Sequence, residues 1–383
     1  MQCGRATSTE MKDTFLRASR QLSVLFAPDY RAGNPYQTLL AEAMRSFDVD
    51  ISFLSDYRRV LPLARGVRSK PSDILHLHWP EYYYDAGTGL PRTLRRLRYP
   101  FDLAWAVRDK CLAVTAHNLS PHSGTNRNAL DTRIRHGLRK AGIVFAHSDR
   151  AKLEIAKLAD IDHSKIQVIP HGDLSAALPM LPNREAARHR LALRSDRKYA
   201  LVFGRLAPYK GIEEIVEFWI REKLNIVLIL AGPPSDIAFE AALKRMAGNS
   251  HNVVLYLRKV SDEELVTFLA GSDCTIFNYQ KLLTSGSAAL ARSVGVPLLF
   301  PERIQTVDLG EPSARVFRFK KLDRDFVVQL QRAVQLSVDY ESAADWRQNT
   351  SWQVVAAETV AAYHRILGRD FPATKIANLI PCA

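Results

Sequence analysis

Short apolar runs alternate with helix-like segments along almost the whole chain, and this alternation limits the fold more than any other feature. Six such runs lie between residues 22 and 169, and five more lie between residues 199 and 300. Short apolar runs bounded by turn residues predict buried strands, and strands separated by helices predict a parallel sheet. The sequence therefore predicts an α/β protein with two doubly wound, Rossmann-like domains.

The alternation pauses once, which suggests where the first domain ends. Residues 176–196 are polar and rich in arginine and show no strand pattern, so we expect a linker with a short helix there. The N-terminal domain is predicted over 21–175 and the C-terminal domain over 197–349. A last helical pattern falls within 350–368, and residues 1–20 are expected to form a disordered basic tail.

Ligands of doubly wound sheets bind beyond the carboxyl ends of the strands. In the N-terminal domain this rule selects the loops at 28–36, 79–85 and 117–123 as the binding edge. His76 and His78 alternate with leucines just before the second loop, so they should share one face of a strand. We expect them to be packed, hydrogen-bonded strand residues rather than catalysts.

A glycine-led turn joins one strand of the C-terminal domain to the helix that follows. Gly204 opens it, Arg205 comes next, and Lys210 and Gly211 close it. Free N–H groups at a helix N-terminus, with two cations beside them, suit an anionic ligand. A plain strand-to-helix turn with solvated charges is the alternative.

A second turn of this type lies further along the same domain, where Thr284, Ser285, Gly286 and Ser287 precede a helix. Small hydroxyl residues there either cap the helix or cradle a diphosphate. Two such turns in one domain predict a nucleoside diphosphate ligand. The sequence contains no G-x-x-x-x-G-K-[ST] loop and no G-x-G-x-x-G after a strand, which argues against an ATPase and a nicotinamide enzyme.

The turn GRLAPYKG, the stretch TSGSAALARSVGVPLL and the two predicted domains resemble glycosyltransferases of the GT-B type, over most of residues 21–367. The resemblance implies two domains that face a cleft. It implies a nucleotide-sugar donor whose diphosphate contacts Gly204, Arg205, Lys210 and Gly211, and an acceptor bound by the N-terminal domain. It also implies that the helix within 350–368 packs back on the N-terminal domain.

One departure from the superfamily pattern bears on whether the reaction retains or inverts the anomeric configuration. The large retaining group carries two glutamates at positions that align with Leu282 and Leu290, and both are missing here. The segments NPYQTLL, DILHLHWPE and TAHNLSPH resemble inverting bacterial exopolysaccharide enzymes, of the kind that moves mannose from GDP-mannose to a lipid-linked oligosaccharide. A retaining transferase that uses a UDP-sugar and a non-catalytic two-lobed sugar-binding protein are the alternatives.

An inverting transfer needs a general base that deprotonates the acceptor hydroxyl, and electrophilic help for the departing diphosphate. The candidates for the base are loop residues of the N-terminal domain: Asp29, Glu81, His117 and His122. A solvated loop acid is the alternative for Glu81, and a structural histidine is the alternative for His117.

The acceptor is expected to contact residues of the first two loops of the N-terminal domain, namely Gly33, Asn34, Tyr36 and Tyr82. Aromatic rings such as Tyr82 commonly stack on sugars. No histidine cluster with metal-ligand spacing occurs in the sequence, so we expect no metal and no cofactor. The nucleotide-sugar is then a substrate.

The formal charge of +13 is concentrated in the N-terminal half, where residues 51–150 hold 17 Lys and Arg against 8 Asp and Glu. This basic excess culminates in a segment that mixes arginines with apolar residues: Arg92, Arg95, Arg96 and Arg98 with Leu94, Leu97, Tyr99, Phe101 and Trp105. We expect Pro100 to break the segment. The pattern predicts docking on an anionic membrane surface, and an ordinary solvated helix face is the alternative.

Other features bear on partners and location. No helix-turn-helix, zinc-finger or RNP motif accompanies the basic residues, which argues against nucleic acid as a partner. No apolar run approaches the roughly 20 residues of a membrane span, and no secretory signal begins the sequence. The four scattered cysteines favour buried thiols and a reducing compartment. We therefore expect a cytoplasmic protein, peripherally associated with the inner face of the cell membrane.

Overall fold

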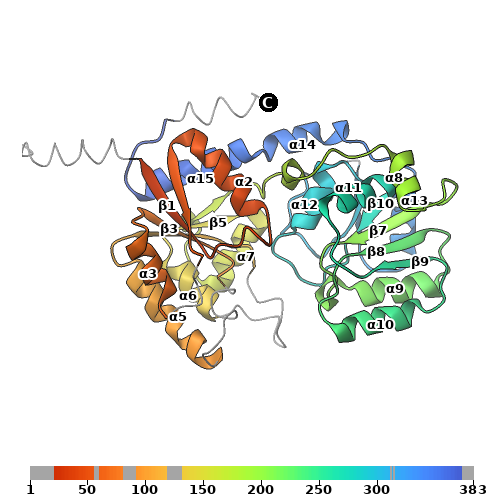
Figure 1. The fold of residues 1–383 in the computed structure, drawn as a ribbon, viewed down its shortest axis with the longest axis horizontal. Helices are drawn as coiled ribbons and strands as arrows, with labels where there is room; N and C mark the ends of the chain where they lie inside the picture. The colour runs from red at the N-terminus through yellow and green to blue at the C-terminus, as the bar shows by residue number, and fades with distance from the viewer. Residues whose placement is uncertain are drawn as a thin grey trace, which may run out of the picture. The chain divides into compact units, whose positions relative to one another are not determined.

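The structure is a computed structural model that describes residues 21–55, 60–80, 92–118, 132–310, 313 and 315–372, with only the backbone described for residues 92, 93, 95 and 96. The expected tail at 1–20 lies outside these ranges. The chain divides into two compact units. Unit 1 comprises residues 1–146, 155–169 and 352–383, and unit 2 comprises residues 147–154 and 170–351 (Figure 1).

The described residues of unit 1 form a parallel six-stranded sheet in the order β2-β1-β3-β4-β5-β6. The strands are β1 (Leu22–Ala27), β2 (Val49–Phe53), β3 (Ile74–His78), β4 (Cys111–Thr115), β5 (Ile143–Ala146) and β6 (Ile166–Val168). The helices are α2 (Tyr36–Met44), α3 (Pro62–Ser69), α5 (Arg92–Ala106), α6 (Thr132–Lys140) and α15 (Trp352–Ile366), and α7 (Asp149–Ala159) begins in unit 2 and ends in unit 1. The strand order reverses direction between β1 and β3, which makes this pair the switch point of the sheet.

The last helix, α15, returns to unit 1 and packs against α2. Its buried residues recur at helical spacing, among them Trp352, Val355 and Tyr363. The Tyr363 hydroxyl lies 2.5 Å from Nδ1 of His76, and the Thr115 hydroxyl lies 2.8 Å from its Nε2. His76 is therefore packed and hydrogen-bonded, as the sequence predicts.

The described residues of unit 2 form a second parallel six-stranded sheet, in the order β12-β11-β10-β7-β8-β9. The strands are β7 (Tyr199–Phe203), β8 (Val227–Ala231), β9 (Val253–Tyr256), β10 (Cys274–Ile276), β11 (Leu298–Pro301) and β12 (Val316–Phe319). The helices are α8 (Arg184–Arg190), α9 (Ile212–Arg221), α10 (Ile237–Ala247), α11 (Asp262–Gly271), α12 (Gly286–Ser293), α13 (Arg324–Ala333) and α14 (Ala344–Asn349). The switch point of this sheet lies between β7 and β10.

The predicted fold class is confirmed, with one strand added. The sequence predicts five strands in unit 2, whereas the structure adds β12 at the edge of the sheet. Arg318 interrupts the short apolar run of this strand, and its side chain donates to the carbonyl of Ile304 at 3.1 Å. An edge strand with one solvated face need not be a continuous apolar run.

A buried carboxylate holds residues 176–196 to unit 2. Asp273, which is fully buried, pairs with Arg184 and Arg188 of α8 and accepts from the backbone N–H of Tyr199 at 2.8 Å. The Arg188–Asp273 distance is 2.9 Å. Removal of one partner from such a buried pair is costly, because the remaining charge stays buried. The segment expected to be a linker is thus packed on the second sheet.

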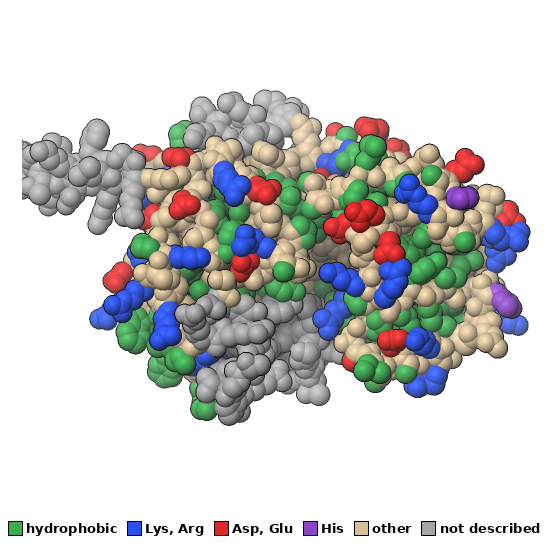
Figure 2. All heavy atoms as spheres, viewed as in Figure 1, with side chains coloured by type: hydrophobic (Ala, Val, Ile, Leu, Met, Phe, Trp, Pro, Cys, Tyr) green, Lys and Arg blue, Asp and Glu red, His purple; other side chains and the backbone are tan. Residues whose placement is uncertain are grey.

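Helix α5 continues through Pro100, so the expected break is wrong. Tyr99, Asp102 and Leu103 flank the proline and are fully buried, which holds the segment in place despite the hydrogen bond that proline removes. Hydrophobic side chains gather beside Lys and Arg side chains over α3 and α5 on the face shown in Figure 2. Within the described ranges, no helix combines the length and apolar composition needed to cross a bilayer.

Candidate active site

The turn after β7 lies at the switch point of unit 2, where doubly wound sheets bind their ligands. Gly204 has φ +78°, and a Cβ on Gly232 would come within 2.0 Å of the Gly204 carbonyl oxygen. The loops that follow β7 and β8 therefore touch through bare backbone. The N–H of Leu206 donates to the carbonyl of Pro233 at 2.9 Å and holds them together.

The side chains of Lys210 and Ser287 converge on Gly204 in this turn. A Cβ built on Gly204 would lie 3.2 Å from Oγ of Ser287 and 3.5 Å from Nζ of Lys210. The Lys210 side chain is buried, and its Nζ donates to the carbonyl of Phe203 at 3.2 Å. A cation and a hydroxyl beside a bare glycine backbone are groups of the kind that bind phosphate oxygens.

Burial, together with the nearby Arg205 guanidinium, lowers the pKa of Lys210 to about 8. The lysine thus carries its charge at a desolvation cost, which an anionic ligand would offset. Arg205 itself is exposed, and its Nη2 lies 3.5 Å from the carbonyl of Ser235 in the loop after β8. Its guanidinium contributes positive potential to the same turn.

The N-terminus of α12 forms the second part of the site. Ser285 caps the helix, because its Oγ accepts from the N–H of Ala288 at 3.1 Å. The Tyr279 hydroxyl lies 3.0 Å from the same Oγ. Thr284, Gly286 and Ser287 are each half-buried around this cap.

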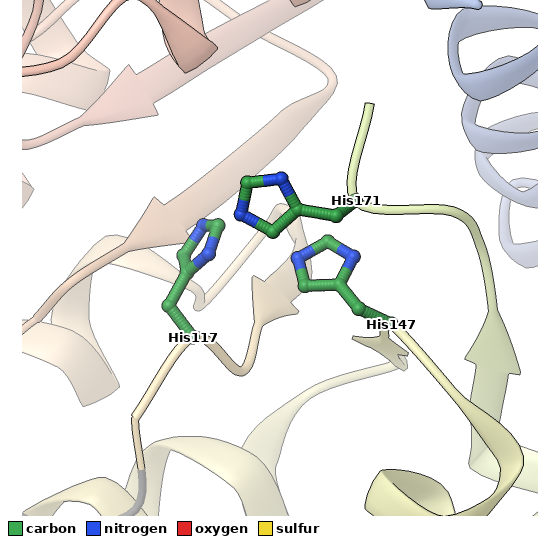
Figure 3. A group of neighbouring side chains, drawn as sticks. All are labelled: His117, His147 and His171. Atoms are coloured by element: carbon green, nitrogen blue, oxygen red, sulfur yellow. The ribbon is translucent and has the colours of Figure 1, made fainter. Parts of the chain in front are cut away.

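Histidines from the loops after β5 and β6 lie beside this helix end. A Cβ on Gly286 would lie 3.5 Å from Cε1 of His171. Figure 3 draws His171 with His147, which also belongs to unit 2, and with His117 of unit 1. The His147 and His171 rings lie 4.9 Å apart. Burial lowers the pKa of His171 to about 4, so this ring is neutral at neutral pH.

A polar network braces the loop that carries Tyr279. Asn278 donates to the carbonyl of Gly211 at 3.1 Å and to the carboxylate of Glu214 at 3.0 Å. Arg303 donates to the Asn278 side chain at 2.6 Å. A Cβ on Gly211 would lie 2.5 Å from Nδ2 of Asn278. Gly211 therefore allows the turn to pack closely on Asn278, and its contact with the diphosphate stays a prediction.

The structure thus brings Gly204, Lys210, Ser285, Gly286 and Ser287 together in unit 2. Tyr279 and His171, which contact the same turn, are not among the predicted site residues. Tyr279 lies in the segment DCTIFNY before the second turn, so its position was a usable signal. The contact of His171 with Gly286 depends on tertiary packing and has no local signal.

Aromatic and imidazole rings cluster at the switch point of unit 1. Trp79 follows β3 and stacks on His117, which follows β4, with ring centroids 3.9 Å apart and planes at 10°. The Tyr36 ring meets the edge of His117 at 4.8 Å. Nδ1 of His78 lies 3.3 Å from Nε2 of His117. The stack fixes the orientation of the His117 ring.

Burial sets the charge of these rings. It lowers the pKa of His78 to about 3 and the pKa of His76 well below its usual value. His78 is therefore neutral at neutral pH, and its Nδ1 lies within hydrogen-bond distance of Nε2 of His117. A small pocket opens beside His117, and no Lys, Arg, Asp or Glu side chain is among the described residues that line it. This chemistry suits a neutral polar ligand, such as a sugar hydroxyl.

Asp29 lies apart from these rings in its contacts. Its carboxylate accepts from Nε and Nη2 of Arg31 at 2.9 and 2.8 Å, and this pairing lowers the pKa of Asp29. A carboxylate held in this way is a weak base. Gly33 packs against the Tyr30 ring, and the Asn34 side chain accepts from the N–H of Tyr36 at 2.9 Å. Gly33 and Asn34 thus shape the loop that presents Tyr36.

Three predicted residues, Glu81, Tyr82 and His122, lie outside the described residues. Their roles as a base or as acceptor contacts stay predictions. The expectation that no metal or cofactor takes part also stays a prediction.

Residues 183–297, which carry both turns of unit 2, match the family model described as "Glycosyl transferases group 1". The fold matches sucrose-phosphate synthase from Thermosynechococcus elongatus, with a TM-score of 0.67 and 14% identity over 91% of this chain and 100% of that chain. It also matches HepE from Anabaena in complex with UDP and glucose, with a TM-score of 0.64 and 13% identity over 90% and 100% of the two chains. The chain is a glycosyltransferase of the GT-B fold.

Two curated proteins are similar to this chain in sequence. GDP-mannose:glycolipid 4-beta-D-mannosyltransferase of Xanthomonas campestris pv. campestris is 22% identical over 322 residues, which cover 77% of this chain and 78% of that protein. D-inositol 3-phosphate glycosyltransferase of Kineococcus radiotolerans is 31% identical over 99 residues, 24% of this chain and 22% of that protein. The predicted enzyme class is confirmed, and the alternative of a non-catalytic sugar-binding protein is set aside.

Proposed function

We propose that this enzyme transfers mannose from GDP-mannose to a lipid-linked oligosaccharide, with inversion at the anomeric carbon, as a step of exopolysaccharide synthesis. The observation that carries the proposal is the convergence of Lys210 Nζ and Ser287 Oγ on the bare backbone of Gly204. It supports a diphosphate donor. The likeness of both units to a GDP-mannose enzyme supports the choice of base and sugar.

In the proposed reaction the bond between the mannose anomeric carbon and the phosphate oxygen breaks, and the acceptor hydroxyl oxygen takes its place. Negative charge builds on the departing GDP. Lys210, Ser287 and the N–H groups at the start of α12 would stabilise that charge more strongly in the transition state than in the bound donor. Arg205 adds a more distant positive charge.

The proton of the acceptor hydroxyl passes to a general base, and we assign this role to His117. The Trp79 stack and the hydrogen bond to the neutral His78 hold its ring in one orientation. An imidazole is suited to this task near neutral pH. Asp29 is the weaker choice, because Arg31 occupies its carboxylate.

Leucine occupies the two positions at which the retaining group carries glutamate. Leu290 is buried in the core of unit 2, and Leu282 packs partly buried against it. No carboxylate from either position can reach a bound donor. This arrangement supports inversion over the alternative of a retaining transferase that uses a UDP-sugar.

The acceptor class implies a location. We propose that the enzyme is cytoplasmic and binds peripherally to the anionic inner face of the cell membrane, where a lipid-linked acceptor lies. The basic excess of residues 51–150 supports this, because cationic surfaces gain about 1 kcal/mol for each Lys or Arg held near anionic lipid. We further propose that the reaction needs no metal, so full activity should survive in EDTA, and restoration of a lost activity by Mg²⁺ would contradict this.

The first test is a thermal-shift screen with GDP, UDP, ADP and CMP on the wild-type protein and on a variant with Arg205→Ala and Lys210→Ala. A ligand that binds only the folded state raises the melting temperature. A shift with GDP alone, lost in the variant, is expected. A shift with UDP alone would favour the UDP-sugar alternative.

The second test is a transfer assay with GDP-mannose and a polyprenyl-diphosphate-linked oligosaccharide, with NMR on the product. A β-linked mannose from the α-linked donor is the expected product. An α-linked product would contradict inversion, and no product from this donor would contradict the proposed function.

A further inference from the structure

Helix α5 is apolar on two opposite faces. One face is buried in unit 1 and includes Tyr99, Leu103 and Ala106. The other face carries a stripe at helical spacing, whose exposed fractions are 51% for Leu94, 65% for Leu97, 75% for Phe101 and 64% for Trp105. A helix on a water-facing surface normally carries polar residues there, so a contiguous apolar stripe marks an interaction site.

The stripe cannot turn inward. Asp102, fully buried on α5, accepts from the N–H groups of Leu63 and Ala64 at 3.0 and 2.9 Å, and so caps the first turn of α3. Rotation of α5 about its axis would break both bonds and expose a carboxylate that now stabilises a helix N-terminus. The outward position of the stripe is therefore built into the packing of α3 on α5.

A cationic groove lies directly beside the stripe. It encloses about 620 Å³, and its lining includes Arg68 of α3 with Arg108 and Lys110 just after α5. Asp109 also lines it, so three cations face one acid. Among the described residues, no ion pair holds the Arg68, Arg108 or Lys110 side chain. Trp105 belongs to both features, because it lines the groove and ends the stripe.

We propose that this face of unit 1 docks on an anionic phospholipid bilayer: the stripe enters the acyl boundary, and the groove holds a lipid phosphate headgroup. The proposal rests on the proposed function, because a lipid-linked acceptor requires the enzyme at a membrane. The inference adds which residues contact the membrane and which parts of the lipid they contact. An amphipathic helix with aromatic and aliphatic residues beside Arg and Lys binds the bilayer interface in this way.

Charge complementarity selects lipid over a second copy of the chain. A two-fold contact brings the same patch of both copies together. The cationic groove of one copy would then face the stripe and groove of the other. The stripe runs from residue 94 to 105, about 17 Å at the helical rise, which is short for a stable dimer interface. Anionic lipid headgroups instead complement the positive charge of the groove. The apolar stripe is removed from water as it enters the acyl boundary.

The experiment is sedimentation of the full chain with vesicles of pure phosphatidylcholine and vesicles that also contain phosphatidylglycerol, at low and high salt. One variant combines Phe101→Ser with Trp105→Ser, and another combines Arg68→Ser with Arg108→Ser. The control variant, Ile237→Ser with Val328→Ser, changes exposed apolar residues of unit 2. Circular dichroism melting checks the fold of each protein.

We expect the wild type and the control to bind the anionic vesicles equally well. The stripe variant should bind them at least about tenfold more weakly. The groove variant should lose the preference for anionic over neutral vesicles and the dependence on salt. Equal binding of the wild type to both vesicles, unchanged binding of the stripe variant, or a wild-type dimer that the stripe variant dissociates would each overturn the proposal.

A parallel thermal shift with GDP separates this inference from the proposed function. A wild-type protein that binds GDP but not anionic vesicles contradicts the docking surface alone. A protein that binds the vesicles through the stripe but shows no shift with GDP contradicts the proposed donor alone.

Discussion

Each sheet reverses its strand order at one point, and the side chains at the two switch points differ in their chemistry. In unit 2 the loops there bring Lys210 and Ser287 to the bare backbone of Gly204. In unit 1 the loops bring Trp79 and Tyr36 onto His117. The topology fixes the place of a ligand, whereas the loop residues fix which ligand it is.

In the proposed reaction, the two switch points perform different parts of the glycosyl transfer. A diphosphate needs fixed positive charge and N–H groups, and unit 2 supplies both. A sugar hydroxyl needs an oriented acceptor of its proton, and unit 1 supplies the imidazole of His117, which the Trp79 stack holds in one orientation. Substitutions in one unit should therefore change one function and spare the other.

The largest effect is expected from His117→Ala. If His117 is the base, the rate of mannose transfer should fall about 10²–10⁴-fold, the range typical of general base catalysis. The melting shift with GDP should stay, because the donor turn lies in unit 2. The measurement is kcat for transfer beside the GDP titration. Loss of GDP binding in this variant would break the division between the units.

The next effect is expected from Gly232→Ala. The new Cβ would meet the Gly204 carbonyl oxygen at 2.0 Å, at a φ of +150° that alanine avoids. Backbone must move, so the free energy of unfolding should fall by about 3 kcal/mol or more, and GDP binding should weaken. Urea denaturation measures this.

Gly33→Ala is the matched control in unit 1, since its Cβ would meet only the movable Tyr30 ring, at 2.8 Å. Gly33→Ala should lower the free energy of unfolding much less than Gly232→Ala does. Equal losses for the two variants would show that the turn after β7 is no more constrained than the loop after β1.

Lys210→Met should weaken GDP binding about 10–100-fold, because one close charge is lost. The substitution should not lower the free energy of unfolding. Burial lowers the pKa of Lys210 to about 8, so the charge of this lysine opposes folding below that pH. The unfolded lysine titrates near its ordinary value, so the wild type gains stability from this group as pH rises from about 8 toward 10.5.

GDP binding by the wild type should weaken over the same rise, because the free protein loses the charge that the diphosphate needs. GDP titrations and melting curves at a series of pH values check both signs. A Lys210→Met variant that keeps the wild-type pH profile would show that another group carries the charge.

Tyr363→Phe should lower the free energy of unfolding by about 1–3 kcal/mol, because Nδ1 of His76 would stay buried without the hydroxyl now 2.5 Å away. The measurement is chemical denaturation, with the exposed Tyr340→Phe as control. No change in stability would mean that water replaces the hydroxyl. GDP affinity should stay the same, since Tyr363 and His76 belong to unit 1.

The smallest effect is expected from Asp29→Asn. Arg31 already occupies this partly exposed carboxylate, and such pairs contribute about 0–1 kcal/mol. Mannose transfer should therefore stay within about twofold of the wild type. A loss of several hundredfold would instead identify Asp29 as the base and remove His117 from that role.

The turn after β7 can be located from the sequence because its features are local. Gly204 and Lys210 stand next to a strand that any apolar-run analysis finds. Strand β12 was missed because Arg318 interrupts a run that is only partly buried. The stack of Trp79 on His117 was also missed. Parallel strands bring these loops to one edge, but the ring orientation depends on packing from Tyr36, which no short pattern encodes.

The return of α15 to unit 1 has a consequence for biosynthesis. Tyr363 and Trp352, which cover His76 and Tyr36, leave the ribosome only after the whole of unit 2. At ordinary elongation rates that delay is about 10–40 s. Throughout this interval the first sheet has its strands but lacks its closing helix. The nascent N-terminal part is therefore the stage most exposed to aggregation, and a chain that stops before residue 352 should depend on chaperones or be degraded.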